Sequence, residues 1–96
     1  MSRATLILHR KRLYDDGAIA EMKLWLVPNA VPGSKPAFKY SLYYGRHGKR
    51  LIGYDNEATK GDHRHYEDRE EIYRFTTPER LMADFLADVQ ALHDVA

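Results

Sequence analysis

Apolar and polar residues alternate along several stretches of the first two thirds of the chain, and this period of two predicts β-strands. The clearest stretch runs from Ala18 to Val27, where Glu21, Lys23 and Trp25 lie on the face opposite the small and apolar residues. Such a strand buries one face and exposes the other to water. Further strands are predicted at residues 5–9, with residues 10–13 as a frayed basic end, at 38–44 and at 49–56.

Short turns that contain glycine join these strands into two hairpins. Residues 14–17 end in Gly17, and residues 45–48 begin and end in glycine, the residue that accepts positive φ in tight turns. Between the hairpins, residues 28–36 hold three prolines and a glycine. Because proline cannot donate a hydrogen bond to a sheet, this segment is predicted to be a loop inside the domain.

The alternation stops after Asn56, and Gly61 interrupts the segment that follows. We expect a loop here that returns to extended structure near His63. Residues 72–75 are a candidate for a short fifth strand. The predicted sheet therefore has four to five strands.

From Thr76 onward the apolar residues follow a helical period. Thr77 followed by Pro78 fits an N-cap and first-turn proline, and Thr76 with Glu79 is an alternative capping box. The helix needs an apolar surface for its stripe, and the inner face of the sheet provides one. The sequence thus predicts an α+β fold, an antiparallel sheet of four to five strands built from two hairpins with one C-terminal α-helix packed across one face. The predicted stripe consists of Leu81, Met82, Phe85, Leu86, Val89 and Leu92.

The composition limits the classes of protein to which the chain can belong. Ninety-six residues fit one domain, residues 1–96, and the absence of cysteine excludes disulfides and cysteine-ligated zinc. The first apolar run is too short for a secretory signal and no stretch could span a membrane, so we expect a cytoplasmic protein. A domain this small gains stability from a partner, and a homodimer is one such partner.

Charge is distributed unevenly along the chain. Residues 1–65 hold twelve Lys and Arg against six Asp and Glu, whereas residues 66–96 hold three against eight. A basic body with an acidic tail suits binding of a polyanion such as RNA. It equally suits charge complementarity within the molecule.

Residues 53–66 carry the densest group of chemically active side chains. If this segment is extended, His63 and His65 point to one face while Asp62 and Arg64 point to the other. Two histidines near neutral pKa can act as general base and general acid, the pairing that cleaves RNA through its 2′-hydroxyl without a metal. The order of the two roles is open.

Neighbouring residues could support this chemistry. Lys60 and Arg64 could bind a phosphate and offset its charge, and Asp62 or Asp55 could orient an imidazole. Asn56 could approach the same site, although Asp and Asn after a strand often bond their own backbone in a turn.

Two other interpretations of the histidines remain open. His63 and His65 with a carboxylate could supply three ligands to a metal ion. Lys60 and Arg64 would repel a cation, so we expect no metal and no other cofactor. Alternatively, the histidines belong to a polar loop and have a structural role.

Tyrosines alternate with cations in the predicted strands. Tyr54 and Tyr66 could stack on bases and Arg50 could pair with phosphates, as single-stranded RNA requires. Tyrosines in strands are more often half-buried packing residues. These residues therefore predict a surface compatible with polyanions.

Taken together, several motifs resemble the TumE family of small bacterial proteins. The opening of the chain is similar as well, so the resemblance spans nearly its whole length. Its most specific part is the core Gly61-Asp62-His63-Arg64-His65. The matching motifs are Gly53-Tyr54-Asp55-Asn56, Lys60 to His65, Tyr73-Arg74-Phe75 and Asp84 to Asp88.

The resemblance implies a toxin of a type II toxin–antitoxin pair that inhibits growth and is neutralised by an antitoxin. The antitoxin of this family is usually a helix-turn-helix protein encoded by the adjacent gene. Many toxins of this size are endoribonucleases, and by analogy we expect a metal-independent one. The alternatives are a module that binds RNA or protein without turnover and a transferase acting on tRNA. The residues that match by position are Asp55, Asn56, Lys60, Asp62, His63, Arg64 and His65.

Overall fold

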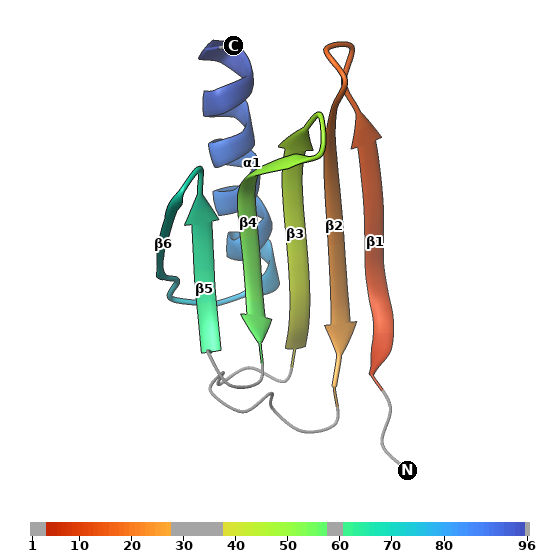
Figure 1. Cartoon of the computed structure of the whole chain (residues 1–96). Coiled ribbons are helices and arrows are strands. Elements are labelled where there is room, and N and C mark those ends of the chain that lie inside the picture. The colour runs from red at the N-terminus through yellow and green to blue at the C-terminus, as the bar shows by residue number, and fades with distance from the viewer. Residues whose placement is uncertain (1–3, 28–37, 58–60, 96) are drawn as a thin grey trace.

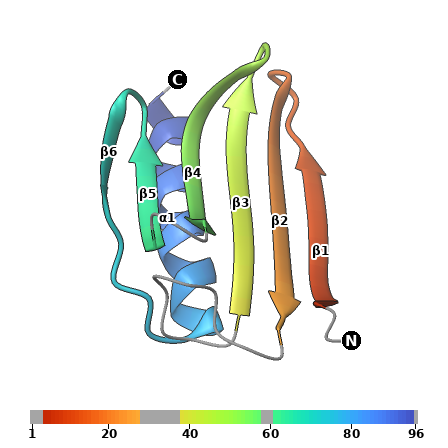
Figure 2. The same ribbon diagram turned by 60° about the horizontal axis from the view of Figure 1, so that its bottom comes forward.

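In the part of the chain that the structure describes, six antiparallel strands form one open sheet, and one α-helix packs against one of its faces (Figures 1 and 2). The computed structural model describes residues 4–27, 38–57 and 61–95. The strands lie in chain order across the sheet, so every neighbouring pair is connected directly in sequence. The elements are β1 Thr5–Leu13, β2 Ala18–Leu26, β3 Phe38–Arg46, β4 Lys49–Glu57, β5 Gly61–Tyr66, β6 Arg69–Ile72 and α1 Pro78–Val95.

The α+β class, the two predicted hairpins and the packed helix are confirmed, but the sheet has six strands instead of four or five. The predicted position of the short strand, residues 72–75, is wrong. β6 begins at Arg69 and ends at Ile72, and residues 73–77 connect it to the helix. The reason is the tight turn after Tyr66, which pairs that residue with Arg69 at once. Glu67 makes this turn at a positive φ of 58°.

Two further predictions concern the first part of the chain. Residues 10–13 are not frayed, since β1 continues through them and Leu13 pairs with Ile19 of β2. The loop predicted at residues 28–36 lies outside the described residues.

The helix begins where the sequence predicted. The backbone N–H of Arg80 donates to Oγ1 of Thr77 at 3.1 Å, so Thr77 is the N-cap and Pro78 the first helical residue. Leu81, Phe85 and Val89 are buried and join a core that the sheet supplies from β2, β3 and β4. Met82 and Leu92 of the predicted stripe are partly buried against this core. Leu86 was predicted on the same stripe but is 47% exposed, so it lies at the edge of the face that packs on the sheet.

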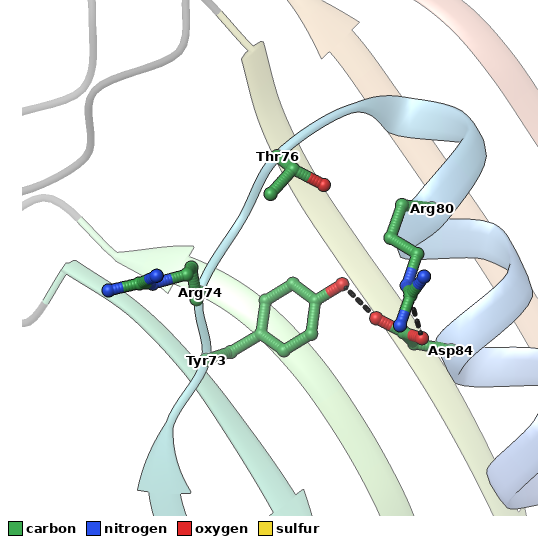
Figure 3. A pocket seen from close by; sticks show the side chains of 5 residues that line it. All are labelled: Tyr73, Arg74, Thr76, Arg80 and Asp84. Carbon is green, nitrogen blue, oxygen red and sulfur yellow. Dashed lines mark hydrogen bonds and ion pairs between the residues drawn. The ribbon is translucent and has the colours of Figure 1, made fainter.

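Tyrosine–carboxylate hydrogen bonds fasten this core at its edge. The hydroxyl of Tyr54 on β4 donates to Asp88 of α1 at 2.5 Å, and that of Tyr73 donates to Asp84 at 2.6 Å (Figure 3). Burial raises the pKa of both tyrosines, and the hydrogen bond to the carboxylate adds to the effect. Both phenols therefore remain neutral donors.

The sheet has two unlike faces. The helix packs over the β4 side of one face, whereas the other face carries no helix in the described part of the chain (Figure 1). We call this second surface the open face. No helix among the described residues has the length and apolar character needed to cross a membrane.

Candidate functional site

Strand registers place the side chains around the two histidines of the open face in two rows. Directly opposed residues of antiparallel strands have Cβ atoms about 4.5–5.5 Å apart, so members of a row are neighbours. The rows bring β4, β5 and β6 together around the two histidines of β5. In order from β1 to β6, the first row is His9, Lys23, Ser41, Asp55, His63 and Ile72. The second row is Lys11, Glu21, Tyr43, Gly53, His65 and Glu70.

His63 and Asp55 form the centre of the site. Nε2 of His63 lies 2.7 Å from Oδ1 of Asp55, and Nδ1 lies 3.2 Å from the carbonyl oxygen of Gly61. Both ring nitrogens thus face oxygen acceptors, although a neutral imidazole has one N–H to donate. The His63 side chain is 7% exposed, so the pair forms the floor of the site.

His65 lies beside this pair and closer to solvent. Its ring meets that of His63 edge to face, with centroids 5.1 Å apart, and its Nε2 lies 3.3 Å from Oε2 of Glu70. Burial lowers the pKa of His65 below 6.5, and the positive charge of Arg50 lowers it further. The neutral imidazole is therefore the favoured form at pH 7.

Arg50 reaches the histidines across a glycine. A Cβ placed on Gly53 would lie 2.9 Å from Cδ of Arg50, so a side chain at position 53 would displace the arginine. Gly53 is opposite His65 in the register of β4 and β5. The glycine thus leaves room for a cation beside His65.

Asp62 and Arg64 lie on the helix side of the sheet, away from the two imidazoles. Asp62 accepts a hydrogen bond of 2.6 Å from the hydroxyl of Tyr40. Nε of Arg64 lies 3.1 Å from Asp88, and its Nη1 lies 3.3 Å from Glu71. Of the two predicted carboxylates, Asp55 contacts an imidazole and Asp62 does not. The Arg64 guanidinium belongs to the contacts between sheet and helix.

Three residues that the sequence suggested for substrate binding make contacts that stabilise the fold. Asn56 is buried, and its amide accepts from the backbone N–H of Tyr40 at 2.9 Å and donates to the carbonyl of Phe38 at 2.8 Å. Tyr54 belongs to the core beneath the helix. Tyr66 is half-buried, and the Arg64 guanidinium lies 5.3 Å from its ring centroid on the helix side.

Arg50, which the sequence suggested for substrate binding, lies on the open face beside His65. Lys60 lies outside the described residues. Further polar and aromatic residues share that face but were not chosen from the sequence as site residues. The alternation of the strands indicates which face each occupies, whereas their proximity to the histidines depends on register. These residues are Ser41, Lys23, Trp25, Lys39, Tyr43 and Glu70.

The site also has the donor set of a metal centre. Asp55, His63 and His65 each offer one ligand atom, and these atoms lie within 4.8 Å of one another. Imidazole nitrogen and carboxylate oxygen are ligands that zinc accepts. The same cluster thus supports proton transfer and metal coordination.

Fold and site together define a small α+β protein with a carboxylate–imidazole cluster on the uncovered face of its sheet. Residues 3–93 match the family described as Toxin TumE, and the chain belongs to this family. No curated protein and no solved structure matches the chain. The protein is therefore a toxin, and membership of a toxin family implies an antitoxin as its partner.

Proposed function

We propose that this toxin is a metal-independent endoribonuclease that cleaves single-stranded RNA on the open face of the sheet. His65 is the general base, and His63, paired with Asp55, is the general acid. The observation that carries the proposal is the contact of 2.7 Å between Asp55 and His63 with the His65 ring 5.1 Å away. Proton donor and proton acceptor thereby lie side by side on one surface.

The chemistry follows from these positions. His65, neutral because its pKa is lowered, takes the proton of the ribose 2′-hydroxyl, whose oxygen attacks the adjacent phosphorus. The bond from phosphorus to the 5′ oxygen breaks, and His63 transfers its proton to that oxygen. The products are a 2′,3′-cyclic phosphate and a 5′-hydroxyl end. Arg50 beside His65 offsets the charge that develops on the phosphate.

Cations and aromatic rings extend the site toward β2. Lys23 precedes Ser41 and Asp55 in the first row, and Lys39 lies with its Nζ 5.6 Å from the ring centroid of Trp25. Phosphates pair with such cations, and unstacked bases stack on aromatic rings. This arrangement supports single-stranded RNA as the substrate class.

The same proposal includes the antitoxin. We propose a helix-turn-helix protein encoded by the adjacent gene, which binds the toxin and prevents growth inhibition in the cytoplasm. Coexpression of that neighbour should restore growth. Copurification of the two proteins measures the association directly.

A second function, binding of RNA without cleavage, is favoured by the burial of His63. Its side chain is 7% exposed and both ring nitrogens already contact oxygens. In this alternative the histidines hold the strands in place, and the cations of the open face sequester RNA. Growth inhibition would then follow from binding alone.

Labelled single-stranded RNA incubated with purified toxin in EDTA separates the two functions. Under the proposed function RNA is cleaved to cyclic phosphate ends, and His65→Gln and Asp55→Asn reduce the rate at least 100-fold, the contribution typical of acid–base catalysis. His9→Gln is the matched control, because His9 pairs with Glu21 at 2.7 Å on the same face. Saturable binding without cleavage by the wild type would instead establish the second function.

A further inference from the structure

The two oxygen contacts of His63 indicate that its ring binds a cation, either an additional proton or a metal ion. Its Nδ1 faces the Gly61 carbonyl at 3.2 Å and its Nε2 faces Asp55 at 2.7 Å. A neutral imidazole has one N–H, so it can donate a hydrogen bond to only one of these oxygens. At the other contact, the lone pair of the ring nitrogen faces a lone pair of the oxygen. Either a second proton or a metal ion between Nε2 and the carboxylate removes this repulsion.

The third donor distinguishes a metal from a proton. A shared proton needs two partners, whereas the ligand atoms of Asp55, His63 and His65 lie together within 4.8 Å. Zinc bonds to nitrogen and oxygen are about 2.0–2.2 Å, which places tetrahedral ligand atoms roughly 3.3 Å apart. The donors that lie up to 4.8 Å apart have to move closer together to reach that spacing.

The surroundings of His63 fit coordination through Nε2. A metal-bound histidine usually donates its other N–H to a carbonyl or carboxylate, which fixes the orientation of the ring. The Gly61 carbonyl, 3.2 Å from Nδ1, has this position. Gly61 has a positive φ of 74°, and its backbone is thus set in the left-handed region that favours glycine.

The charge of the site also suits a cation. Repulsion by Arg64, an argument against a metal when the sequence is considered alone, does not apply because its guanidinium contacts Asp88 and Glu71 on the helix side. Beside the two histidines, the carboxylates of Asp55 and Glu70 accompany the guanidinium of Arg50. The cations Lys23 and Lys39 of the same face belong to β2 and β3, whereas the histidines belong to β5.

We propose that Asp55, His63 and His65 bind one Zn²⁺ ion, and that the bound ion inhibits the toxin. Zinc coordination occupies the imidazole lone pairs that proton transfer requires, so the zinc-bound toxin cannot catalyse cleavage. The inhibition rests on the proposed ribonuclease function, whereas the binding does not. The toxin would then be active when zinc is scarce.

Metal binding is tested first and without RNA. Titration of the full chain with Co²⁺ should give the visible absorption of a four-coordinate ion, saturate at one equivalent and disappear when Zn²⁺ is added. His65→Gln and Asp55→Asn should abolish the signal. His9→Gln should retain the signal. His9 forms a similar pair with Glu21, but neither residue belongs to the group of three metal-ligating residues.

Because His63 is buried, we expect His63→Gln to destabilise the fold, and binding is therefore tested with variants of the two less buried ligands. Circular dichroism spectra of these two variants show whether they are folded. Zinc should also raise the Tm of the wild type and leave that of His65→Gln unchanged. Absence of binding by the wild type, or equal binding by His65→Gln, overturns the site.

Cleavage of labelled RNA is then measured with zinc and with EDTA. The inference predicts at least tenfold slower cleavage at saturating zinc and full recovery in EDTA. Zinc that binds at the site and leaves cleavage unchanged or accelerates it overturns the inhibition. Zinc binding without cleavage under either condition supports the site and refutes the proposed ribonuclease, whereas cleavage without zinc binding does the reverse.

Discussion

Arg64 shows how neighbouring residues on one strand acquire different roles. His63 and His65 face the open side, and Arg64 between them faces the helix, where it contacts Asp88 at 3.1 Å. The sequence places all three in one motif, and its period of two correctly predicts that the arginine points away from the histidines. Proximity in sequence therefore does not make Arg64 a phosphate-binding residue.

Arg64→Ala is expected to lower stability more than activity. Loss of the guanidinium leaves the half-buried Asp88 with the Tyr54 hydroxyl as its remaining described partner, at a cost of about 1.5–3 kcal/mol. Arg50→Ala, a change of an exposed residue, should alter the free energy of unfolding by less than about 0.5 kcal/mol and weaken RNA binding. Urea unfolding and RNA affinity measure the two effects, and the opposite pattern would contradict these roles.

The raised pKa of Tyr54 makes the free energy of unfolding depend on pH in the alkaline range. Burial, followed by the hydrogen bond to Asp88, raises the pKa of Tyr54 above its ordinary value of 10.0. Because the unfolded chain loses this proton first, the stabilisation is complete below pH 10 and is lost as pH rises above it. Tyr54→Phe should show a smaller loss of unfolding free energy over this range. Equal losses in variant and wild type would contradict the assignment.

At the scale of elements, regular alternation made β2, β3 and β4 predictable, and apolar spacing with a cap made α1 predictable. β6 has the sequence Arg-Glu-Glu-Ile and is exposed at every position, so no burial pattern marks it. Backbone pairing with β5 forms this strand. A strand stabilised in this way leaves little trace in the sequence.

The candidate site was predictable to a similar extent. Its two imidazoles share a face, as the period of two requires, but Asp55 and not Asp62 contacts one of them. The period of two already turns Asp62 to the opposite face, and register then places Asp55 opposite His63. Register depends on how two segments pair, which the pattern of either segment alone does not define.

The helix start offers a direct comparison of two adjacent threonines. Thr77→Ala removes the hydroxyl that accepts from the Arg80 N–H and should cost about 1 kcal/mol of unfolding free energy. Thr76→Ala, at the exposed preceding position, should cost less than about 0.5 kcal/mol. Thermal or urea unfolding measures both, and a larger effect at Thr76 would favour the capping box with Glu79.

At the scale of the whole molecule, the open face depends on the helix behind it. Phe85 is fully buried against the sheet. Phe85→Ala should therefore reduce the free energy of unfolding by about 3–5 kcal/mol and abolish toxicity, although the residue lies on the side away from the histidines. Leu86→Ala is the control, because Leu86 is 47% exposed.

In this comparison, urea unfolding gives the stability and growth of the expressing cells gives the toxicity. Expression levels should be matched by immunoblot. A Phe85→Ala variant that remains folded and fully toxic would show that the site does not need the core beneath it.

The order of the elements has a consequence for synthesis. A ribosome releases the chain from its N-terminus, so all six strands emerge before α1. Until the helix docks, the apolar face of β3 and β4 lacks its cover, and the strands that align Asp55 with the histidines have no stable support. We therefore expect the nascent toxin to be inactive until α1 has left the ribosome and packed on the sheet.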